Sequence, residues 1–291
     1  MFLRASAVPA VPSAVWLFQI RIFEKMKVID QLNREIEFNF PPKRIISLVP
    51  SQSELLWHLG LQEELVGITK FCIHPNEMFR KVKRIGGTKT VKFDEIKKLQ
   101  PDLIIANKEE NEQEQIEELC KHFPVWISDI YNLEDALKMI QKIGEITHRN
   151  NAARDLIEEI HKNHKTFKIQ NPENKNKKTV AYLIWKSPYM AAGRKTFITE
   201  MLNECGFTNV FENHSDRYPE ITIQNLIEEK PDLIFLSSEP YPFKEKHVEE
   251  LKAHLPDSKI LLVDGEMFSW YGNRLLQAFD YFEKLIQEIN R

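Results

Sequence analysis

Two loops of this chain hold side chains that could bind a metal or a flat organic ligand. In the first, Cys72 and His74 lie two residues apart just before Pro75, and sulfur and imidazole are both metal ligands. Two residues of spacing without a second cluster are not a metal signature, so a structural histidine before a proline is the competing interpretation. We keep His74 as the candidate metal ligand.

The second loop is aromatic. Residues 269–273 (Ser-Trp-Tyr-Gly-Asn) stand outside any apolar period, which favours a ligand-facing loop over a core segment. Trp185 ends an apolar strand, so a core position and a ligand-facing position are equally compatible with it. An aromatic ring buries about 150–250 Å² and can stack, which suits a large flat ligand.

Charged side chains in other loops allow two interpretations. Five basic residues are candidates for contacting an anionic ligand, with ordinary surface charge as the alternative: Lys89, Lys186, Arg194, Arg217 and Arg274. Arg274 could instead cap a loop. Residues 109–112 (Glu-Glu-Asn-Glu) follow an apolar strand, where open α/β sheets bind ligands, although an acidic helix N-terminus explains them more simply. Residues 239–242 (Glu-Pro-Tyr-Pro) form the corresponding later loop.

Composition and motifs favour binding over catalysis. The 291 residues are 42% hydrophobic and 29% charged with a net charge of −3, so no basic field points to nucleic acid. Nine glycines without a G-x-G-x-x-G or G-x-x-x-x-G-K motif argue against a nucleotide-dependent enzyme. No Ser-His-Asp set, carboxylate pair or zinc motif with persuasive spacing is visible, and the three cysteines have no close pairing.

The elements that position these loops repeat along the chain. Residues 93–105 and residues 223–235 each consist of an amphipathic helix, a Pro-Asp break and a short apolar run typical of a strand buried on both faces. The flanking strands repeat as well, since residues 44–49 match 179–184 and residues 124–128 match 260–264. Two copies of a strand–helix–strand unit predict two α/β lobes with a cleft between them.

Helices are expected between the lobes. Asn132 caps a helical stretch, and a second runs over residues 152–167, so the connector predicts a stiff hinge. In the first lobe, Ser51 and Glu54 are predicted to form the capping box of a helix that stops at Gly60. The predicted segments are an N-terminal extension and lead-in (1–42), an N-terminal α/β lobe (43–131), connecting helices with a linker (132–178) and a C-terminal α/β lobe (179–291).

The first 25 residues allow two interpretations. The stretch is weakly apolar, is broken by Pro9 and Pro12, and is shorter than the roughly 20 apolar residues that span a bilayer. It is either a degenerate export signal or an upstream extension of a chain that starts at Met26. No cysteine follows it directly, so we expect no lipoprotein anchor. Residues 27–42 are expected to form a short strand pair or an extended lead-in.

Several short motifs point to one family. They are Arg-Ile-Ile-Ser-Leu-Val-Pro-Ser-Gln-Ser-Glu (44–54), Leu-Val-Gly-Ile-Thr (65–69), Ile-Gly-Gly-Thr (85–88), Lys-Leu-Gln-Pro-Asp-Leu (98–103) and Asn-Val-Phe (209–211). With two α/β lobes joined by a long helix, they make residues 43–290 resemble the helical-backbone metal-receptor superfamily. The resemblance implies an α/β fold of two Rossmann-like lobes with a ligand cleft between them. It also implies a substrate-binding protein of an ABC importer for cobalamin, ferric siderophores or haem.

Within the superfamily the chain is most similar to the cobalamin-binding branch, which lines its cleft with aromatic side chains. Matched by motif, the resemblance places ligand-binding residues at Phe71, Trp185, Tyr218 and Glu266, and Phe268, Trp270 and Tyr271 crowd the last of these loops. A further aromatic position of the family falls on Thr88, beside Lys89, so one wall differs here. His74 is a candidate axial ligand to the cobalt of a corrinoid or the iron of haem.

The family also docks its transporter through an acidic residue on each lobe. The first position falls on Asp94, whereas the second falls on Gln224, with Glu228 and Glu229 nearby. The expected protein is therefore a monomeric substrate-binding protein without an intrinsic cofactor, which holds cobalamin or another corrinoid for an ABC-transporter permease. Its localisation is expected to be periplasmic. A ferric siderophore or haem is the alternative cargo, and a cytosolic corrinoid- or tetrapyrrole-handling protein is the alternative class.

Overall fold

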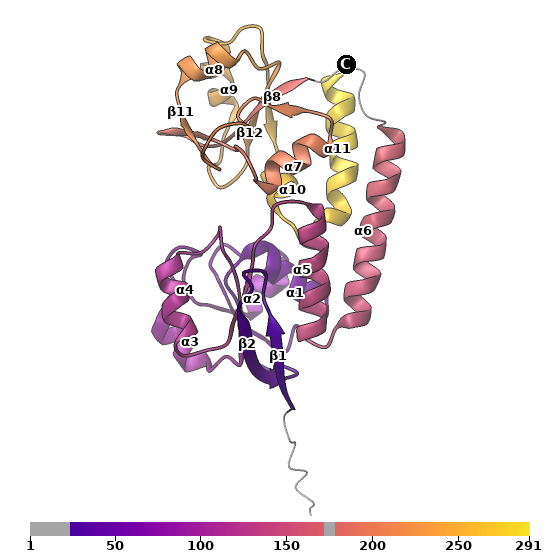
Figure 1. The fold of residues 1–291 in the computed structure, drawn as a ribbon. Helices are drawn as coiled ribbons and strands as arrows, with labels where there is room; N and C mark the ends of the chain where they lie inside the picture. Colours follow the sequence, from indigo (N-terminus) through magenta and orange to yellow (C-terminus); the bar gives the residue numbers. More distant parts are fainter. Residues whose placement is uncertain (1–23, 172–177) are drawn as a thin grey trace, which may run out of the picture.

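The computed structural model describes residues 24–171 and 178–291, which form two α/β lobes beside a set of long helices (Figure 1). The N-terminal lobe lies below and the C-terminal lobe above in that view. This two-lobed α/β architecture confirms the predicted fold class. The predicted export signal or upstream extension lies almost entirely outside the described residues, as does most of the linker before the second lobe.

The N-terminal lobe is built on a five-stranded parallel sheet with the order β5-β4-β3-β6-β7. Every residue of β3, β6 and β7 is buried, as their continuous apolar sequences predict for strands covered on both faces. The strands are β3 (Ile45–Ser47), β4 (Leu65–Ile68), β5 (Lys83–Arg84), β6 (Leu103–Asn107) and β7 (Val125–Ser128). The helices are α1 (Pro50–His58), α2 (Asn76–Lys81), α3 (Phe93–Leu99) and α4 (Gln113–Cys120).

The predicted strand pair before this lobe is present as a hairpin. Strands β1 (Glu24–Ile29) and β2 (Glu35–Phe40) pair antiparallel, so the first of them begins two residues before Met26. The Asp30 carboxylate closes the turn by accepting the backbone N–H groups of Leu32 and Arg34.

The C-terminal lobe holds a mixed sheet with the order β11-β9-β8-β12-β13, and β10 pairs with β8. The strands are β8 (Thr179–Trp185), β9 (Tyr189–Ala191), β10 (Thr208–Asn209), β11 (Glu220–Ile221), β12 (Leu233–Ser237) and β13 (Lys259–Val263). The helices are α7 (Phe197–Glu204), α8 (Ile223–Glu229), α9 (Glu245–Lys252), α10 (Gly265–Ser269) and α11 (Leu275–Ile289).

The internal repeat has a structural basis in its Pro-Asp break. Helices α3 and α8 both end at a residue in the left-handed conformation, Gln100 (φ 46°) and Lys230 (φ 48°). The Asp102 carboxylate then accepts the backbone N–H of Arg44, directly before β3, and the Asp232 carboxylate accepts that of Thr179, the first residue of β8. Each repeat therefore ties the helix–strand unit to the central strand beside it.

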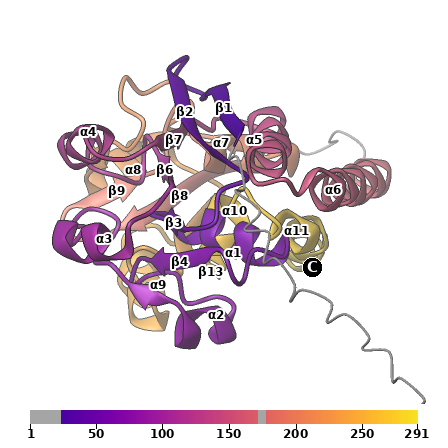
Figure 2. The ribbon, with the colours of Figure 1, turned by 90° about the horizontal axis from the view of Figure 1, so that it is seen from below.

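Two successive helices connect the lobes, as predicted. Asn132 caps α5 (Leu133–Ile146) through its side-chain oxygen, and α6 (Asn150–Gln170) follows after a short turn. A Cβ at Gly144 would lie 2.4 Å from that of Ala153, so only glycine lets α5 and α6 approach this closely. Helix α6 runs beside both lobes and packs against α5 and α11, on one side of the molecule (Figures 1 and 2).

The predicted capping box of the first helix is wrong. Helix α1 begins at Pro50 with Val49 as N-cap and has no side-chain cap, because the valine side chain carries no atom that accepts a hydrogen bond. The predicted stop is confirmed, since Gly60 has φ +84° directly after the helix. Glu54 is free of any capping role and contacts the other lobe instead.

Candidate functional site

The loops after the carboxyl ends of the strands meet where the two lobes face each other, the position at which open α/β sheets bind ligands. We call this region the inter-lobe junction. It comprises the loops after β3, β4, β5, β6 and β7 in the N-terminal lobe, and those after β10, β12 and β13 in the C-terminal lobe. Within the described residues, two ion pairs cross it, Arg274–Glu54 and Arg217–Glu109, together with a contact between His74 and Glu266.

Arg274, just before α11, connects the lobes through two carboxylates. Its guanidinium donates to Glu54 of α1 at 2.8 Å and to Glu266 of α10 at 2.9 Å, and it lies over the Trp270 ring at 4.7 Å from the centroid. The second oxygen of Glu266 lies 3.3 Å from Nε2 of His74, which belongs to the N-terminal lobe. Burial raises the pKa of Glu266, against the opposing effect of Arg274 and His74. Arg274 therefore joins the lobes rather than facing an anion or capping a loop.

A second ion pair crosses the junction near the end of β6. Arg217 of the C-terminal lobe donates to Glu109 of the N-terminal lobe at 2.7 Å, and its guanidinium lies 4.8 Å from the centroid of the Tyr131 ring. Burial raises the pKa of the Glu109 carboxyl, and the nearby Tyr218 hydroxyl and Arg217 oppose this effect. The predicted ligand residue Tyr218 thus lies at the junction, close to Glu109.

Glu239, which follows β12, positions the predicted aromatic loop. One of its carboxylate oxygens accepts the indole N–H of Trp270 and the hydroxyl of Ser269, both at 2.8 Å. Burial raises the pKa of Glu239. The Gly272 position lets the loop reach α1, because a Cβ there would lie 2.9 Å from the Ser51 carbonyl oxygen.

Glu110 is the carboxylate of the junction that has no ion-pair or hydrogen-bond partner among residues 24–171 and 178–291. Glu110 is accessible to solvent, although many protein atoms lie around its carboxylate. The loss of hydration that these atoms cause, together with the negative charges of Glu109 and Glu239, raises the pKa of Glu110 to about 7. The interpretation of residues 109–112 as a plain helix N-terminus does not describe Glu110, because helix α4 begins only at Gln113.

The aromatic predictions divide into exposed and buried rings. Phe71 is 50% exposed and Trp185 is 40% exposed, with the Trp185 ring edge-on to Tyr241 at 5.6 Å. Trp270 and Tyr271 are each 6% exposed, so a ligand reaches them only if the junction opens.

Phe268 is not part of a ligand wall. It is fully buried and packs against Tyr182 and Phe282 at centroid distances of 5.2 and 4.7 Å. The prediction that Phe268 faces the ligand is wrong, because Phe268 lies on the buried side of helix α10 and its ring packs into the core of the C-terminal lobe.

The loop around Thr88 is fixed within the N-terminal lobe. The backbone oxygen of Thr88 accepts a hydrogen bond from Asn111 at 3.0 Å. Lys89 donates to the Glu109 carbonyl oxygen at 3.0 Å and pairs with Glu112 at 3.4 Å. Both predicted residues thus lie beside the acidic loop that follows β6.

Cys72 and His74 do not share a metal site. Cys72 is buried, its sulfur lies 3.1 Å from the hydroxyls of Ser53 and Thr69, and burial raises the pKa of its thiol, which keeps it protonated. Within the described parts of the chain, no three His, Cys, Asp or Glu side chains are grouped to hold a metal ion. His74 remains at the junction, bound to Glu266.

Two of the basic candidates lie elsewhere. Lys186 pairs with Glu250 of α9, within the C-terminal lobe. Arg194 lines a pocket of about 570 Å³ between the lobes. Its lining residues are Tyr131 and Asn132 from the first lobe, with Arg194, Lys195, Thr196, Thr199, Glu200, Asn203, Glu212 and Asn213 from the second.

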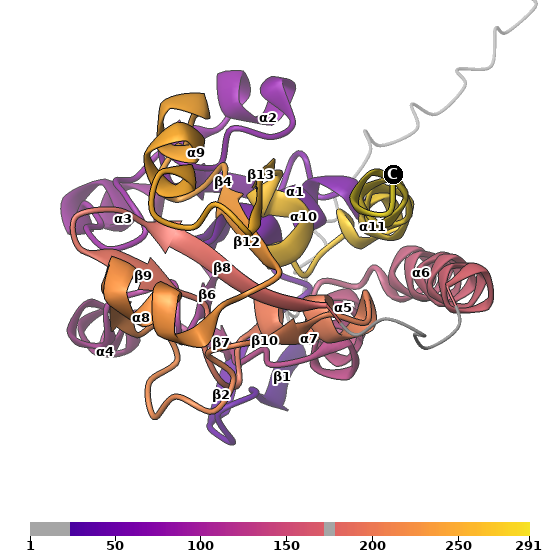
Figure 3. The same ribbon diagram turned by 90° about the horizontal axis from the view of Figure 1, so that it is seen from above.

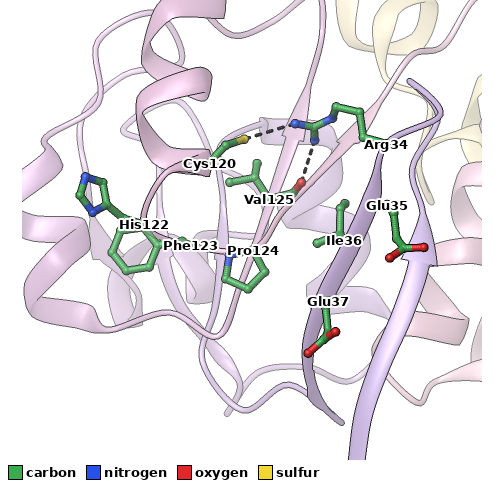
Figure 4. A pocket seen from close by; sticks show the side chains of 9 residues that line it. All are labelled: Arg34, Glu35, Ile36, Glu37, Cys120, His122, Phe123, Pro124 and Val125. Atoms are coloured by element: carbon green, nitrogen blue, oxygen red, sulfur yellow. Dashed lines mark hydrogen bonds between the residues drawn. The ribbon is translucent and has the colours of Figure 1, made fainter.

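A further pocket, of about 360 Å³, lies within the N-terminal lobe between β2, the end of α4 and the start of β7 (Figure 4). There Arg34 donates to the Cys120 sulfur at 3.3 Å and to the Val125 carbonyl oxygen at 2.8 Å. Its lining residues belong to the N-terminal lobe and to the hairpin before it, and none of them to the inter-lobe junction, so this pocket is not the candidate site.

The two predicted docking residues occupy equivalent places. Asp94 lies in the first turn of α3 and Gln224 in the first turn of α8, and both are exposed. Gln224 donates to Glu228 at 3.0 Å. Both helices lie away from α6, on the opposite side of the molecule (Figures 2 and 3). Of the helices in the described residues, none has the length and apolar character needed to cross a membrane.

Sequence reasoning missed the partners that hold the junction together, Glu54 and Tyr131, and the positioning role of Glu239. Glu54 had a plausible local role as a capping residue, and nothing in its spacing pointed to Arg274, 220 residues away. The signal that existed was the position of Glu239 after an apolar strand.

Comparison with known proteins adds a family and a set of similar folds. A family model described as "Periplasmic binding protein" matches residues 45–256. The vitamin B12-binding protein of Vibrio parahaemolyticus is 29% identical over 205 residues, which cover 68% of this chain and 72% of that protein. The vitamin B12-binding protein of Pectobacterium carotovorum is 24% identical over 242 residues, covering 81% and 86%.

Solved structures of the same fold bind different ligands. The periplasmic vitamin B12 binding protein of Vibrio cholerae superposes with a TM-score of 0.75 at 19% identity, covering 86% of this chain and 99% of that one. The periplasmic haem-binding protein of Roseiflexus has the same TM-score at 18% identity and the same coverage. These similarities establish the fold and leave the ligand open.

Proposed function

Since the chain belongs to the periplasmic binding protein family, we propose that it captures a corrinoid such as cobalamin between its lobes and delivers it to the permease of an ABC importer. Members of this family are solute carriers, so the chain is not an enzyme, and the chelate is cargo rather than a cofactor. The proposed place of action is the periplasm, and the proposed working form is a monomer.

The pairing of the basic residues is the observation that carries the choice of cargo. Haem and ferric siderophores present carboxylates or other anionic groups, which need unpaired cations for recognition. Four of the five basic candidates pair with carboxylates of this chain: Lys89, Lys186, Arg217 and Arg274. Arg194, which lines the pocket of about 570 Å³, is the one of the five that has no carboxylate partner among residues 24–171 and 178–291. A corrinoid is rimmed by neutral amides, which need hydrogen-bond acceptors and flat apolar surface. The junction offers carboxylates and the exposed ring of Phe71 in the loop after β4, and the exposed ring of Trp185 packs on Tyr241 of the loop after β12.

The curated relatives support the same cargo. The vitamin B12-binding proteins of Vibrio parahaemolyticus and Pectobacterium carotovorum align with most of this chain. The fold itself is shared with haem-binding proteins and therefore does not discriminate between a corrinoid and haem as cargo. His74 is the feature that favours haem as second candidate, because its imidazole is at the junction, although a bound iron would have to displace Glu266 from it.

Calorimetric titration of the purified chain tests this proposal. Cyanocobalamin is expected to bind one-to-one, and haemin is expected to bind more weakly or not at all. If haemin binds clearly and cyanocobalamin does not, the cargo is haem rather than a corrinoid. Loss of haemin binding in His74→Ala would then identify His74 as the iron ligand. Heat from neither chelate would refute the corrinoid proposal.

We also propose that the permease contacts the exposed ends of α3 and α8. Asp94 supplies the acidic contact on the first lobe, and Glu228, bonded to Gln224, supplies it on the second. Asp94→Lys is expected to abolish cobalamin uptake by cells while leaving cobalamin binding to the purified protein intact. Fractionation of cells into periplasm and cytosol separates this role from that of a cytosolic tetrapyrrole-handling protein.

A further inference from the structure

Carboxylates from both lobes converge on one part of the inter-lobe junction. Glu109 and Glu110 follow β6 of the N-terminal lobe, and Glu239 follows β12 of the C-terminal lobe. Glu109 and Glu239 both raise the pKa of Glu110, so the three carboxylates lie within electrostatic reach of one another at the junction. Like charges held this close raise the energy of the ionised forms unless a partner offsets them.

The three carboxylates differ in what already binds them. Glu109 is held by Arg217 and Tyr218, and one oxygen of Glu239 is held by Ser269 and Trp270. Glu110 has neither a cation nor a hydrogen-bond donor on it in the described parts of the chain, and its side chain is exposed. Glu110 is thus the acceptor of the junction that is ready for an outside donor.

A buried hydroxyl beside this cluster is also unpartnered. Tyr271 is only 6% exposed, and its hydroxyl makes no hydrogen bond within the described residues, although Ser51 lies near it. Glu110 and Glu109 both act on this hydroxyl electrostatically and raise the pKa of Tyr271, as burial does. A buried polar atom without a partner costs free energy, so it marks a place where a bound group or water completes the site.

We propose that Glu110, assisted by the Tyr271 hydroxyl, selects the cargo by accepting hydrogen bonds from N–H donors on the rim of a metal chelate and by repelling chelates rimmed with carboxylates. The inference rests on the proposed function and deepens it, because it names the chemical class of group that is recognised: primary amides and ammonium groups. A hydrogen bond to an ionised acceptor is stronger than one between neutral groups, and it changes affinity about ten- to a hundred-fold.

Selection by Glu110 makes binding depend on pH. The charged and titratable groups that interact with it are Glu109, Lys89, Tyr218, Glu239, Tyr271 and Cys72, and of these Lys89 alone favours its ionised form. Because N–H donors stabilise the carboxylate, the ligand lowers the pKa of Glu110 and releases a proton. Affinity for an amide-rimmed chelate therefore rises from pH 6 to pH 8, and affinity for a carboxylate-rimmed chelate falls.

The test compares the wild-type chain with Glu110→Gln and, as matched control, Glu114→Gln, which removes an exposed carboxylate from the first turn of α4. Tyr271→Phe removes only the unpartnered hydroxyl. Each protein is titrated with cyanocobalamin and with haemin at pH 6, 7 and 8, and thermal melting confirms that the variants fold.

Glu110→Gln is expected to bind cyanocobalamin about tenfold more weakly at pH 8, to bind haemin more tightly and to lose the pH dependence. Tyr271→Phe is expected to bind cyanocobalamin several-fold more weakly, and the control is expected to match the wild type.

If Glu110→Gln keeps the wild-type affinity and pH dependence for cyanocobalamin, the inference is overturned while the proposed function stands. If the wild type binds haemin but not cyanocobalamin, the corrinoid proposal is overturned. In that case, tighter haemin binding by Glu110→Gln would support the inference, and haemin binding that is no tighter would overturn the inference as well.

Discussion

Arg274 lies at the centre of the contact between the lobes. It pairs with Glu54 and Glu266, and the side chains of all three are between 11% and 16% exposed. Removing one member of such a group leaves the other charges buried without compensation, and this penalty, more than the lost attraction, determines the effect on stability.

Arg274→Gln is therefore expected to lower the free energy of unfolding by about 2–4 kcal/mol, measured by urea denaturation. Lys186→Gln is the matched control, because its partner Glu250 is exposed, and it is expected to cost less than about 1 kcal/mol. Equal losses in the two variants would contradict the structural role given to Arg274.

Trp185 and Phe268 separate ligand contact from core packing. Trp185→Ala is expected to weaken cyanocobalamin binding by at least about 1 kcal/mol and to leave the unfolding free energy nearly unchanged, because its ring is 40% exposed. Phe268→Ala is expected to lower the unfolding free energy by about 3–5 kcal/mol, because it empties a core position. Titration and urea denaturation of both variants provide the two readouts, and a stability loss in Trp185→Ala as large as that in Phe268→Ala would place its ring in the core.

At the scale of elements, the repeated Pro-Asp break is the feature that fixes each lobe. Asp232 accepts the backbone N–H and the hydroxyl of Thr179, and these hydrogen bonds lower the pKa of its carboxyl. A lowered pKa in the folded state means that its stabilising effect is present above the unfolded pKa and is lost as the pH falls through the folded pKa.

Asp232→Ala is expected to lower the unfolding free energy by about 1 kcal/mol at pH 7, and the difference from wild type is expected to shrink in acid. Asp257→Ala removes an exposed aspartate without this role and serves as control. A difference that stays constant between pH 7 and pH 3 would show that the carboxylate hydrogen bonds are not its cause.

Local patterns explain which elements the sequence could predict. The helix, the Pro-Asp break and the apolar strand of each repeat are all neighbours along the chain, so residues 93–105 and 223–235 predicted α3–β6 and α8–β12 correctly. Asn132 was predictable as a cap for the same reason. Phe268 was placed wrongly because four residues separate it from the end of β13, and only the short helix α10 decides which way its ring points.

The site was less predictable than the fold because its contacts join distant segments. The pairs Glu54–Arg274 and Glu109–Arg217 are 220 and 108 residues apart, and each member has an ordinary local explanation. The ligand-binding and docking positions came from the family resemblance, and of these the structure places Phe71 and Trp185 in solvent and Tyr218 and Glu266 at the junction.

The whole molecule is two lobes whose relative position depends on a long helix and a few ion pairs. Helix α6 packs beside both lobes (Figure 1). Within the described residues, side-chain pairs and the close approach of Gly272 to the Ser51 carbonyl oxygen cross the junction. Such an arrangement suits a modest opening that exposes Trp270 and Tyr271 and closes again over a chelate.

Hydrogen–deuterium exchange with and without cyanocobalamin tests most directly whether the chelate binds between the lobes. We expect slower exchange in loops of both lobes, namely residues 69–75 and 108–112 in the first and residues 238–242 and 264–273 in the second. The exposed ends of α3 and α8 are expected to exchange at unchanged rates. Protection confined to one lobe, or located only outside these four loops, would contradict a binding site at the inter-lobe junction.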